Sequence, residues 1–407
     1  MSGKWPGGFI KKTAPTVVGP VDGEGGSASG IWTLDQAADY EQRGLWPAPT
    51  IPRALYAWGY NQTGAMGDGS TTDKSSPVQI GSLLTWKNPP HIGKATSAAV
   101  DNEGRLWTWG RGSNGALGHG NTTTLSSPTQ VGALTTWQSV QVGATACLAV
   151  KTDGTLWSWG LNTAGQLGLG NTTNYSSPVQ VGALTTWLTV AGGQYFSAAI
   201  KTDGTLWAWG NNSQGSLGNS AIGTNISSPI QVGALTNWLR VAAGAYMCAA
   251  IKTDGTIWTW GYNTVGQLGQ GNTTRTSSPV QVGALTTWTS IEPGGYTVLA
   301  LKTDGTLYAW GNNNYGDLGV GDTTNRSSPT QVGSLTTWAS AASFGNNGIA
   351  IKTDGTLWTW GRNNYGSLGL GNTTQYSSPV QVGTNTNWSG VAGGSRLNSI
   401  TMFATTG

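Results

Sequence analysis

Short runs of β-branched and aromatic residues recur along the chain, and each run ends at glycine, proline or an Asp-Gly pair. Between Pro178 and Gly218 the runs fall near residues 179–181, 187–191, 196–201 and 205–209. This spacing is typical of β-strands joined by tight turns, with Asp203-Gly204 as a hairpin turn. We predict four short antiparallel strands and no helix in this unit.

The same unit recurs along most of the chain. The last tryptophan of its "LWxWG"-type segment recurs at a spacing of 50 or 51 residues. Repeats of this length, made of four short strands, stack radially into a β-propeller because a single unit cannot bury both faces of its sheet. Seven copies therefore predict seven blades. The tryptophans that mark them are Trp58, Trp109, Trp159, Trp209, Trp260, Trp310 and Trp360.

The two ends of the repeat region complement each other. Residues Ala54–Gly59 match the fourth strand of the unit but lack its hairpin partner, and the C-terminal "NSITMFATTG" matches the third strand but lacks the strand that follows. Pairing the two segments would remove open sheet edges. We predict an all-β, seven-bladed propeller over residues 54–407, closed by its N- and C-terminal strands and preceded by an arm over residues 1–53.

Nineteen of the 22 tryptophans follow the repeat period. Seven follow the "ALTT" turn, twelve lie in the "LWxWG" segments, and Trp5, Trp32 and Trp46 lie outside. Strictly periodic tryptophan is typical of packing between blades, because each buried ring removes about 150 to 250 Å² from water. The alternative is a platform for stacking sugars. We expect packing.

Charge excludes several classes of partner. Only 9% of the residues are charged and the formal net charge is +3, so the chain has no basic field for nucleic acid. No apolar run is long enough for a signal peptide or a membrane span. We therefore expect synthesis in a cytoplasm, without insertion into a membrane.

Cys147 and Cys248 occupy equivalent places in non-adjacent repeats, and we expect no disulfide between them.

Catalytic motifs are absent from the sequence. His91 and His119 are the only histidines, and both are expected in exposed loops. No HExxH, GxSxG, CxxC or P-loop pattern occurs. The acidic residues fall mainly in repeated Asp-Gly turns, where the turn itself explains them. We therefore expect no enzymatic activity, no metal site and no cofactor.

Comparing the repeats with one another divides the propeller into two faces. Strands alternate in direction, so the "ALTT" and "KTDGT" turns share one face, here called the constant face. Its repeated Lys and Asp residues are expected to form a solvated surface. The "GGxx" turns and the long loops after "WG" share the other face, called the variable face, because their residues differ between blades.

Variable residues on a rigid scaffold are typical of a binding surface, and Tyr and Arg are enriched at binding hot spots. We therefore predict that the variable face binds the partner; drift of unconstrained loops is the alternative. The candidate residues are Tyr195, Phe196, Tyr246, Met247, Tyr296, Asn346, Arg396, Arg111, Tyr262, Tyr315, Arg362 and Tyr365.

The pattern "VAGGQYFSAAIKTDGTLWAWGNNSQGSLG", followed by a Pro-x-x-Val strand, resembles the repeat of the regulator of chromosome condensation family. The resemblance covers residues 54–407 and implies a seven-bladed propeller. It implies little about function, because members include a nucleotide exchange factor for a small GTPase, a plant photoreceptor and a β-lactamase inhibitor. The histidine that the family repeat often carries just before its third strand is missing here, so exchange activity is not expected. Its place is taken by Ala146, Phe196, Met247, Thr297, Asn347 and Leu397.

The arm contains a separate element, "GSASGIWTLDQAADYEQRGLWP". Thr33 can cap a short helix over about residues 34–43, and Gly44 supplies its end. This stretch resembles a segment in structural proteins of tailed bacteriophages, which implies a virion component and makes the arm a tether. The alternative is a strap across its own propeller. The candidate anchor residues are Trp32, Leu34, Tyr40 and Trp46.

The sequence alone thus favours a non-enzymatic phage virion protein, serving as a tail fibre, tail tip or capsid decoration. Its arm would bind other virion proteins, and one propeller face would bind a host surface protein or glycan. The alternatives are a free-standing protein-binding propeller, such as an inhibitor or scaffold, and a glycan-binding lectin.

Overall fold

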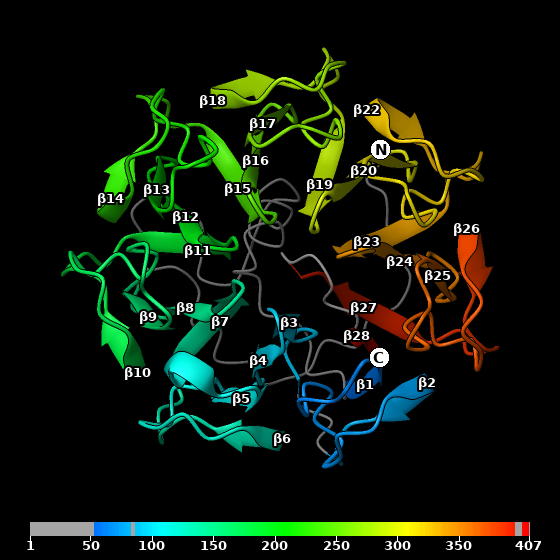
Figure 1. Ribbon diagram of the computed structural model, residues 1–407, viewed down its shortest axis with the longest axis horizontal. Coiled ribbons are helices and arrows are strands. Elements are labelled where there is room, and N and C mark those ends of the chain that lie inside the picture. The colour runs from blue at the N-terminus through cyan, green and yellow to red at the C-terminus, as the bar shows by residue number, and fades with distance from the viewer. Residues whose placement is uncertain (1–52, 83–85, 395–400, 407) are drawn as a thin grey trace, which may run out of the picture. The chain divides into compact units, whose positions relative to one another are not determined.

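A computed structural model of the chain describes residues 53–82, 86–394 and 401–406. These residues form seven four-stranded antiparallel sheets, arranged as blades around a central axis (Figure 1). The predicted all-β, seven-bladed fold is confirmed. Helical structure in the described residues is limited to one short 3-10 turn, η1 (Ser113–Gly115), and none of it has the length and apolar character needed to cross a bilayer. The predicted helix near residues 34–43, with Trp32, Leu34, Tyr40 and Trp46, lies outside the described residues.

In six of the blades the strands run in chain order from the axis to the rim (Figure 1). The first three blades are β3 (His91–Ile92), β4 (Thr96–Val100), β5 (Leu106–Gly110) and β6 (Leu125–Gln130); β7 (Trp137–Val142), β8 (Ala146–Lys151), β9 (Leu156–Gly160) and β10 (Tyr175–Gln180); and β11 (Trp187–Gly192), β12 (Phe196–Lys201), β13 (Leu206–Gly210) and β14 (Ile226–Gln231).

The next three blades have the same order. They are β15 (Trp238–Ala243), β16 (Met247–Lys252), β17 (Ile257–Gly261) and β18 (Thr276–Gln281); β19 (Trp288–Pro293), β20 (Thr297–Lys302), β21 (Leu307–Gly311) and β22 (Arg326–Gln331); and β23 (Trp338–Phe344), β24 (Asn347–Lys352), β25 (Leu357–Gly361) and β26 (Tyr376–Gln381). The outer strands begin earlier than predicted: β10 starts at Tyr175 because this residue still pairs with Gly160 across a bulge.

The seventh blade joins the two ends of the repeat region. It consists of β27 (Trp388–Ala392) and β28 (Thr401–Thr406) together with β1 (Ala54–Gly59) and β2 (Lys74–Gln79). Strands β1 and β28 pair without interruption from Ala54↔Thr406 to Gly59↔Thr401. The predicted closure is therefore confirmed, and it removes the sheet edges at which an open ring would aggregate.

The periodic tryptophans pack between blades, as predicted. The last Trp of each "LWxWG"-type strand is fully buried. Its Nε1–H donates a hydrogen bond of 2.8 to 3.0 Å to a carbonyl in the loop of the preceding blade, so each blade is fastened to its neighbour. The seven bonds are Trp109 to Ala65, Trp159 to Ala116, Trp209 to Gln166, Trp260 to Ser216, Trp310 to Gln267, Trp360 to Asp317 and Trp58 to Ser367.

Candidate functional site: the variable face

In six of the blades, the described part of the variable face is built from two adjacent positions. The first lies in the turn between the two inner strands, and the second follows the "WG" pair at the start of the long loop. The backbone N–H of the second residue donates to the carbonyl of the first, at 2.8 to 3.0 Å, so the structure brings together the two sets of variable residues. The pairs are Arg111 with Ala95, Leu161 with Thr145, Asn211 with Tyr195, Tyr262 with Tyr246, Asn312 with Tyr296 and Arg362 with Asn346.

A buried asparagine fixes each of six long loops. In the blade β15–β18, Asn263 Oδ1 accepts the backbone N–H of Leu268 at 2.9 Å, while its Nδ2 donates to the carbonyls of Asn272 and Thr274 at 3.1 and 2.8 Å. Because these bonds satisfy the loop backbone internally, the loop is a fixed support for its exposed side chains. The equivalent residues are Asn61, Asn162, Asn212, Asn313 and Asn363, all fully buried.

The inner turns are also joined from blade to blade around the axis. Ala144 N–H donates to Gly193 O at 3.2 Å, and Gln194 N–H donates to Ala245 O at 3.1 Å. Glycine is needed for this close approach, since a Cβ on Gly143 would lie 2.5 Å from Gly193 O. The turns therefore hold the variable residues at fixed spacings.

Three tyrosines form a row across two blades. The rings of Tyr246 and Tyr262 lie 6.3 Å apart in a T-shaped arrangement, and Tyr262 lies 5.6 Å from Tyr296 of the next blade. Burial, together with the two neighbouring phenols, raises the pKa of Tyr296. All three side chains are half-buried, so each keeps part of its ring available while its position is fixed by its neighbours.

The row continues as aromatic and cationic pairs between further blades. The Arg362 guanidinium lies 4.8 Å from the centre of the Tyr315 ring, a cation–π contact. One blade on, Tyr365 and Tyr60 pack at 5.3 Å, and Tyr365 is 38% exposed. In both pairs, a tyrosine in the long loop of one blade (Tyr315 or Tyr365) contacts the first residue of the long loop of the next blade (Arg362 or Tyr60). The face therefore carries aromatic or cation–π contacts between neighbouring blades, from the blade β15–β18 round to the seventh blade.

Two predicted site residues do not lie on this surface. Phe196 and Met247 are 2% and 1% exposed and belong to the core. Each fills the space under its turn because a glycine stands three residues earlier: a Cβ on Gly193 would lie 2.1 Å from Phe196 Cε1, and one on Gly244 would lie 3.0 Å from Met247 Cγ. The prediction that they contact the partner is corrected accordingly.

The other predicted residues fall in three places. Tyr195 and Asn346 are half-buried in their turns, and Arg111 is exposed at the start of its loop. Arg396 lies outside the described residues. We expected His91 in an exposed loop, but the structure places it in strand β3. Its Nε2 lies 3.1 Å from Gln141 Nε2, and burial lowers the pKa of the imidazole to about 4.

Two acids near the ring axis and the variable face were not predicted: half-buried Glu292 and fully buried Asp317. Burial raises the pKa of Glu292, on the inner strand β19, to about 7, although Arg240 opposes the shift. Burial likewise raises the pKa of Asp317 to about 8, although the backbone of Tyr315 and the charge of Arg362 oppose the shift. A sequence signal for Asp317 exists, since "GDLG" stands where other repeats have "GQLG", "GSLG" or "GALG".

The constant face differs from the expected solvated array of charges. In five blades the Lys ammonium lies over aromatic rings; Lys201 Nζ is 3.6 Å from the centre of Trp207 and 4.9 Å from that of Trp187. The lysine is only 7% exposed because its stem and ammonium cover these rings. The Asp carboxylate instead accepts from a nearby threonine, as in the bond from Thr205 Oγ1 to Asp203 at 2.6 Å.

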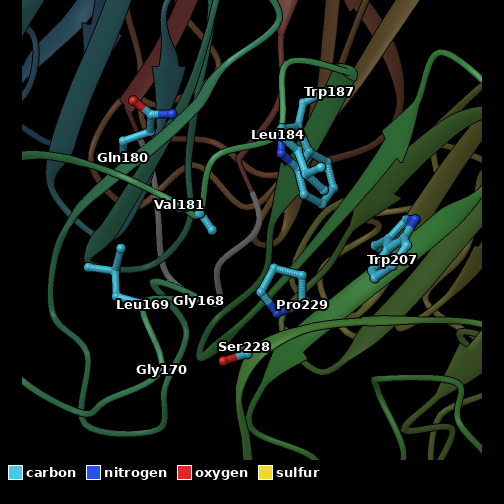
Figure 2. Close-up of a pocket in the computed structure, with 11 residues that line it drawn as sticks. Gly168, Leu169, Gly170, Gln180, Val181, Leu184, Trp187, Trp207, Ser228 and Pro229 are labelled. Carbon is cyan, nitrogen blue, oxygen red and sulfur yellow. The ribbon is translucent and has the colours of Figure 1, made fainter.

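A groove on the flank between two blades was also not predicted. It measures about 350 Å³ and lies between the outer strands β10 and β14, where Figure 2 shows Leu184, Trp187 and Pro229 around it. Leucines equivalent to Leu184 are 43 to 49% exposed in the repeated "ALTT"-type turns. They are Leu134, Leu184, Leu235, Leu285 and Leu335.

The described residues contain no group of three or more His, Cys, Asp or Glu side chains that could hold a metal ion. Cys147 and Cys248 are buried free thiols, and burial raises the pKa of each.

The chemical groups that the variable face offers are tyrosine rings with their hydroxyls and arginine guanidinium groups, which suit contact with another macromolecule.

Comparison with known proteins agrees with the fold. The family model of the RCC1-like domain matches residues 91–400, and that of the regulator of chromosome condensation (RCC1) repeat matches residues 54–92. The chain is 34% identical over 96 residues to human E3 ubiquitin-protein ligase HERC2, and 32% identical over 123 residues to the ultraviolet-B receptor UVR8 of Arabidopsis thaliana. These alignments cover 23% and 30% of this chain, but only 2% and 26% of the two relatives.

Solved propellers are similar over most of the chain. Prp20p of Saccharomyces cerevisiae, whose structure was described with its binding to Gsp1p and histones, gives a TM-score of 0.77 at 19% identity, covering 90% of this chain and 94% of that one. Yeast RCC1 (Prp20) bound to Kap60 gives 0.79 at 19% identity, with 97% and 96% covered. Human WBSCR16 gives 0.75 at 20% identity, with 87% and 98% covered. At these identities the likeness shows the fold.

Proposed function

This chain belongs to the RCC1-like domain family, and from that premise we propose that it is a non-catalytic propeller that binds a protein partner through its variable face. The observation that carries the proposal is the fixed row of Tyr246, Tyr262 and Tyr296, extended by the pair of Tyr315 and Arg362. Tyrosine contributes a large contact area and a hydrogen bond at low cost in side-chain entropy, and arginine is likewise enriched at binding hot spots.

Two further observations support this function. The loops that present these side chains are held by buried hydrogen bonds, so little ordering is required on binding. Structurally similar propellers bind proteins: yeast Prp20 was solved with Kap60, and its binding to Gsp1p was described. The identity of the partner of this chain does not follow from those names.

Replacement of Tyr195, Tyr246 and Tyr296 with alanine should abolish co-purification of the partner from extracts of the source organism. Thermal unfolding should shift by only a few degrees, because the side chains are half-buried. A matched control replaces Leu134, Leu184 and Leu235 with serine; these are also large side chains in turns, but they are exposed on the constant face. Partner binding that survives the tyrosine changes, or is lost equally in the leucine control, would reject the proposal.

A virion role is a second, finer proposal. It is supported by the resemblance of "SGIWTLDQ" to phage structural proteins, in a stretch outside the described residues. A virion protein would be made in the host cytoplasm and incorporated through its arm. Deletion of residues 1–50 should then prevent incorporation into particles while the propeller still binds its partner. Unchanged location after the deletion would favour the free-standing protein-binding propeller, and selective binding on a glycan array would favour a lectin.

A further inference from the structure

We propose that the partner surface recognised by the variable face is acidic, and that it contacts a cationic sector beside the tyrosine row; this inference rests on the proposed function. The cationic sector is defined here by Arg362 and Arg111, with Tyr60 between them along the ring. Arg362, Tyr60 and Arg111 follow "WG" in three consecutive blades, so they occupy equivalent places around the ring.

Charge on the variable face is unevenly distributed. The turns and loops of the blades β7–β10 and β11–β14 contain no charged residue over positions 143–145, 161–174, 193–195 and 211–225. Arg111 lies exposed in the adjoining blade β3–β6, and Arg362 lies in the blade β23–β26. The exposed Arg275 lies at the far end of its long loop, just before β18. Among the first residues of the long loops, positive charge therefore occurs only at Arg362 and Arg111.

The nearby acids are largely occupied or neutral. Asp68 accepts bonds from Asn61 and Ser70 and lies 3.8 Å from Lys74 Nζ, while Asp73 accepts the backbone N–H of Asn61 at 2.7 Å. Asp317 is fully buried, and burial raises its pKa and favours its neutral form, although Arg362 opposes the shift. Among the described residues, none of these acids forms an ion pair with Arg111 or Arg362. Both guanidinium groups can therefore donate hydrogen bonds to a carboxylate of a partner.

The environment of Arg362 fixes its guanidinium for recognition. The guanidinium lies over the Tyr315 ring, 4.8 Å from its centre. With the Asn364 side-chain amide turned so that its oxygen faces the arginine, that oxygen accepts from Arg362 Nε and Nη2 at 3.3 and 3.1 Å. A guanidinium held in this way keeps further N–H groups for a planar carboxylate. The aromatic rings on either side suit apolar side chains of the same partner segment.

The test uses the full chain and three fluorescein-labelled peptides: octaglutamate, octaglutamine and octalysine. Fluorescence anisotropy should show octaglutamate binding at least about tenfold more tightly than octaglutamine in about 20 mM NaCl, with no binding of octalysine. Raising NaCl to about 200 mM should weaken the glutamate complex several-fold, because exposed charges are screened over a shorter distance.

Two double variants with the same change in net charge locate the effect. Arg111→Gln with Arg362→Gln should weaken octaglutamate binding at least about fivefold. Thr152→Glu with Thr202→Glu places the same charge change in exposed turns of the constant face, and should alter affinity less than about twofold. Circular dichroism of both variants confirms folding. Equal losses in the two variants, or equal affinity for octaglutamine and octaglutamate, would overturn the proposal.

This outcome is separable from that of the tyrosine experiment. If the tyrosine variant loses its partner while the arginine variant binds that partner and octaglutamate normally, the protein-binding function stands and the acidic partner is rejected. If the tyrosine variant retains its partner while the arginine variant loses octaglutamate, the proposed function fails and the cationic sector remains as an anion-binding surface.

Discussion

At the residue scale, Asp317 shows how one substitution within a repeat changes local chemistry. Two blades earlier, Ser216 lies at the equivalent position, since Trp260 donates to Ser216 O as Trp360 donates to Asp317 O. Ser216 Oγ donates to Tyr246 O at 2.7 Å. Asp317 has no such bond, and its desolvated carboxyl group is stabilised in the neutral form, with a pKa of about 8.

Asp317→Ser should therefore reduce the pH dependence of stability. The pKa of Asp317 is higher in the folded state than in the unfolded chain, so the folded protein keeps a proton that the unfolded chain releases above about pH 4. The free energy of unfolding then falls as pH rises toward 8, by at most about 1.4 kcal/mol per pH unit. Urea unfolding at about pH 5 and about pH 8 should show a smaller fall in the variant.

Glu292 also has a raised pKa, of about 7, and it also lowers the free energy of unfolding as pH rises. Because Glu292 is present in both proteins, its contribution cancels when the pH dependence of the variant is compared with that of the wild type. Identical pH dependence in the two proteins would mean that Asp317 is ionised at neutral pH in the folded state.

At the scale of elements, the Asp-Gly hairpin turn links blades as well as strands. Gly204 has a φ of 74°, which favours glycine, and its carbonyl accepts the backbone N–H of Trp238 in the next blade at 3.1 Å. A Cβ there would lie 2.0 Å from Thr236 O. The turn predicted from sequence as a simple hairpin therefore also positions the following blade, which a local pattern cannot reveal.

Gly204→Ala should be far more destabilising than Gly182→Ala. Gly182 has a similar φ of 62°, but a Cβ added to it would have no atom within 4 Å. The control variant thus carries only the conformational cost of about 1 kcal/mol, whereas Gly204→Ala must also displace the backbone of the next turn, for a total of about 3 kcal/mol or more. Chemical denaturation measures the free energy of unfolding of both variants. Equal losses of stability would show that the backbone at Thr236 does not restrict a side chain at position 204.

At the scale of the whole molecule, the repeat period was sufficient to predict the architecture. The spacing of Trp58 and its equivalents indicated seven blades, and the unpaired strand at Ala54–Gly59 indicated how the ring closes. Both predictions succeed because each repeat must bury its apolar faces against similar neighbours.

The candidate site could be predicted only in part. The sequence placed Tyr246 and Phe196 at neighbouring positions of equivalent turns, but only the packed blade shows that the first is half-buried and the second is in the core. The lysines were predicted to be solvated for a similar reason. The rings of Trp187 and Trp207, which Lys201 covers, come from the two strands on either side of β12, so the contact depends on the register of the sheet.

The most direct test of partner binding by the variable face is site-specific photocrosslinking. A photoreactive p-benzoylphenylalanine would replace Tyr262 in the tyrosine row, and in a separate protein it would replace Leu184 on the constant face. After irradiation in an extract of the source organism, mass spectrometry should find one partner protein joined to the probe at position 262 and absent at position 184. The same partner joined only at position 184, or no adduct at either position, would contradict the account.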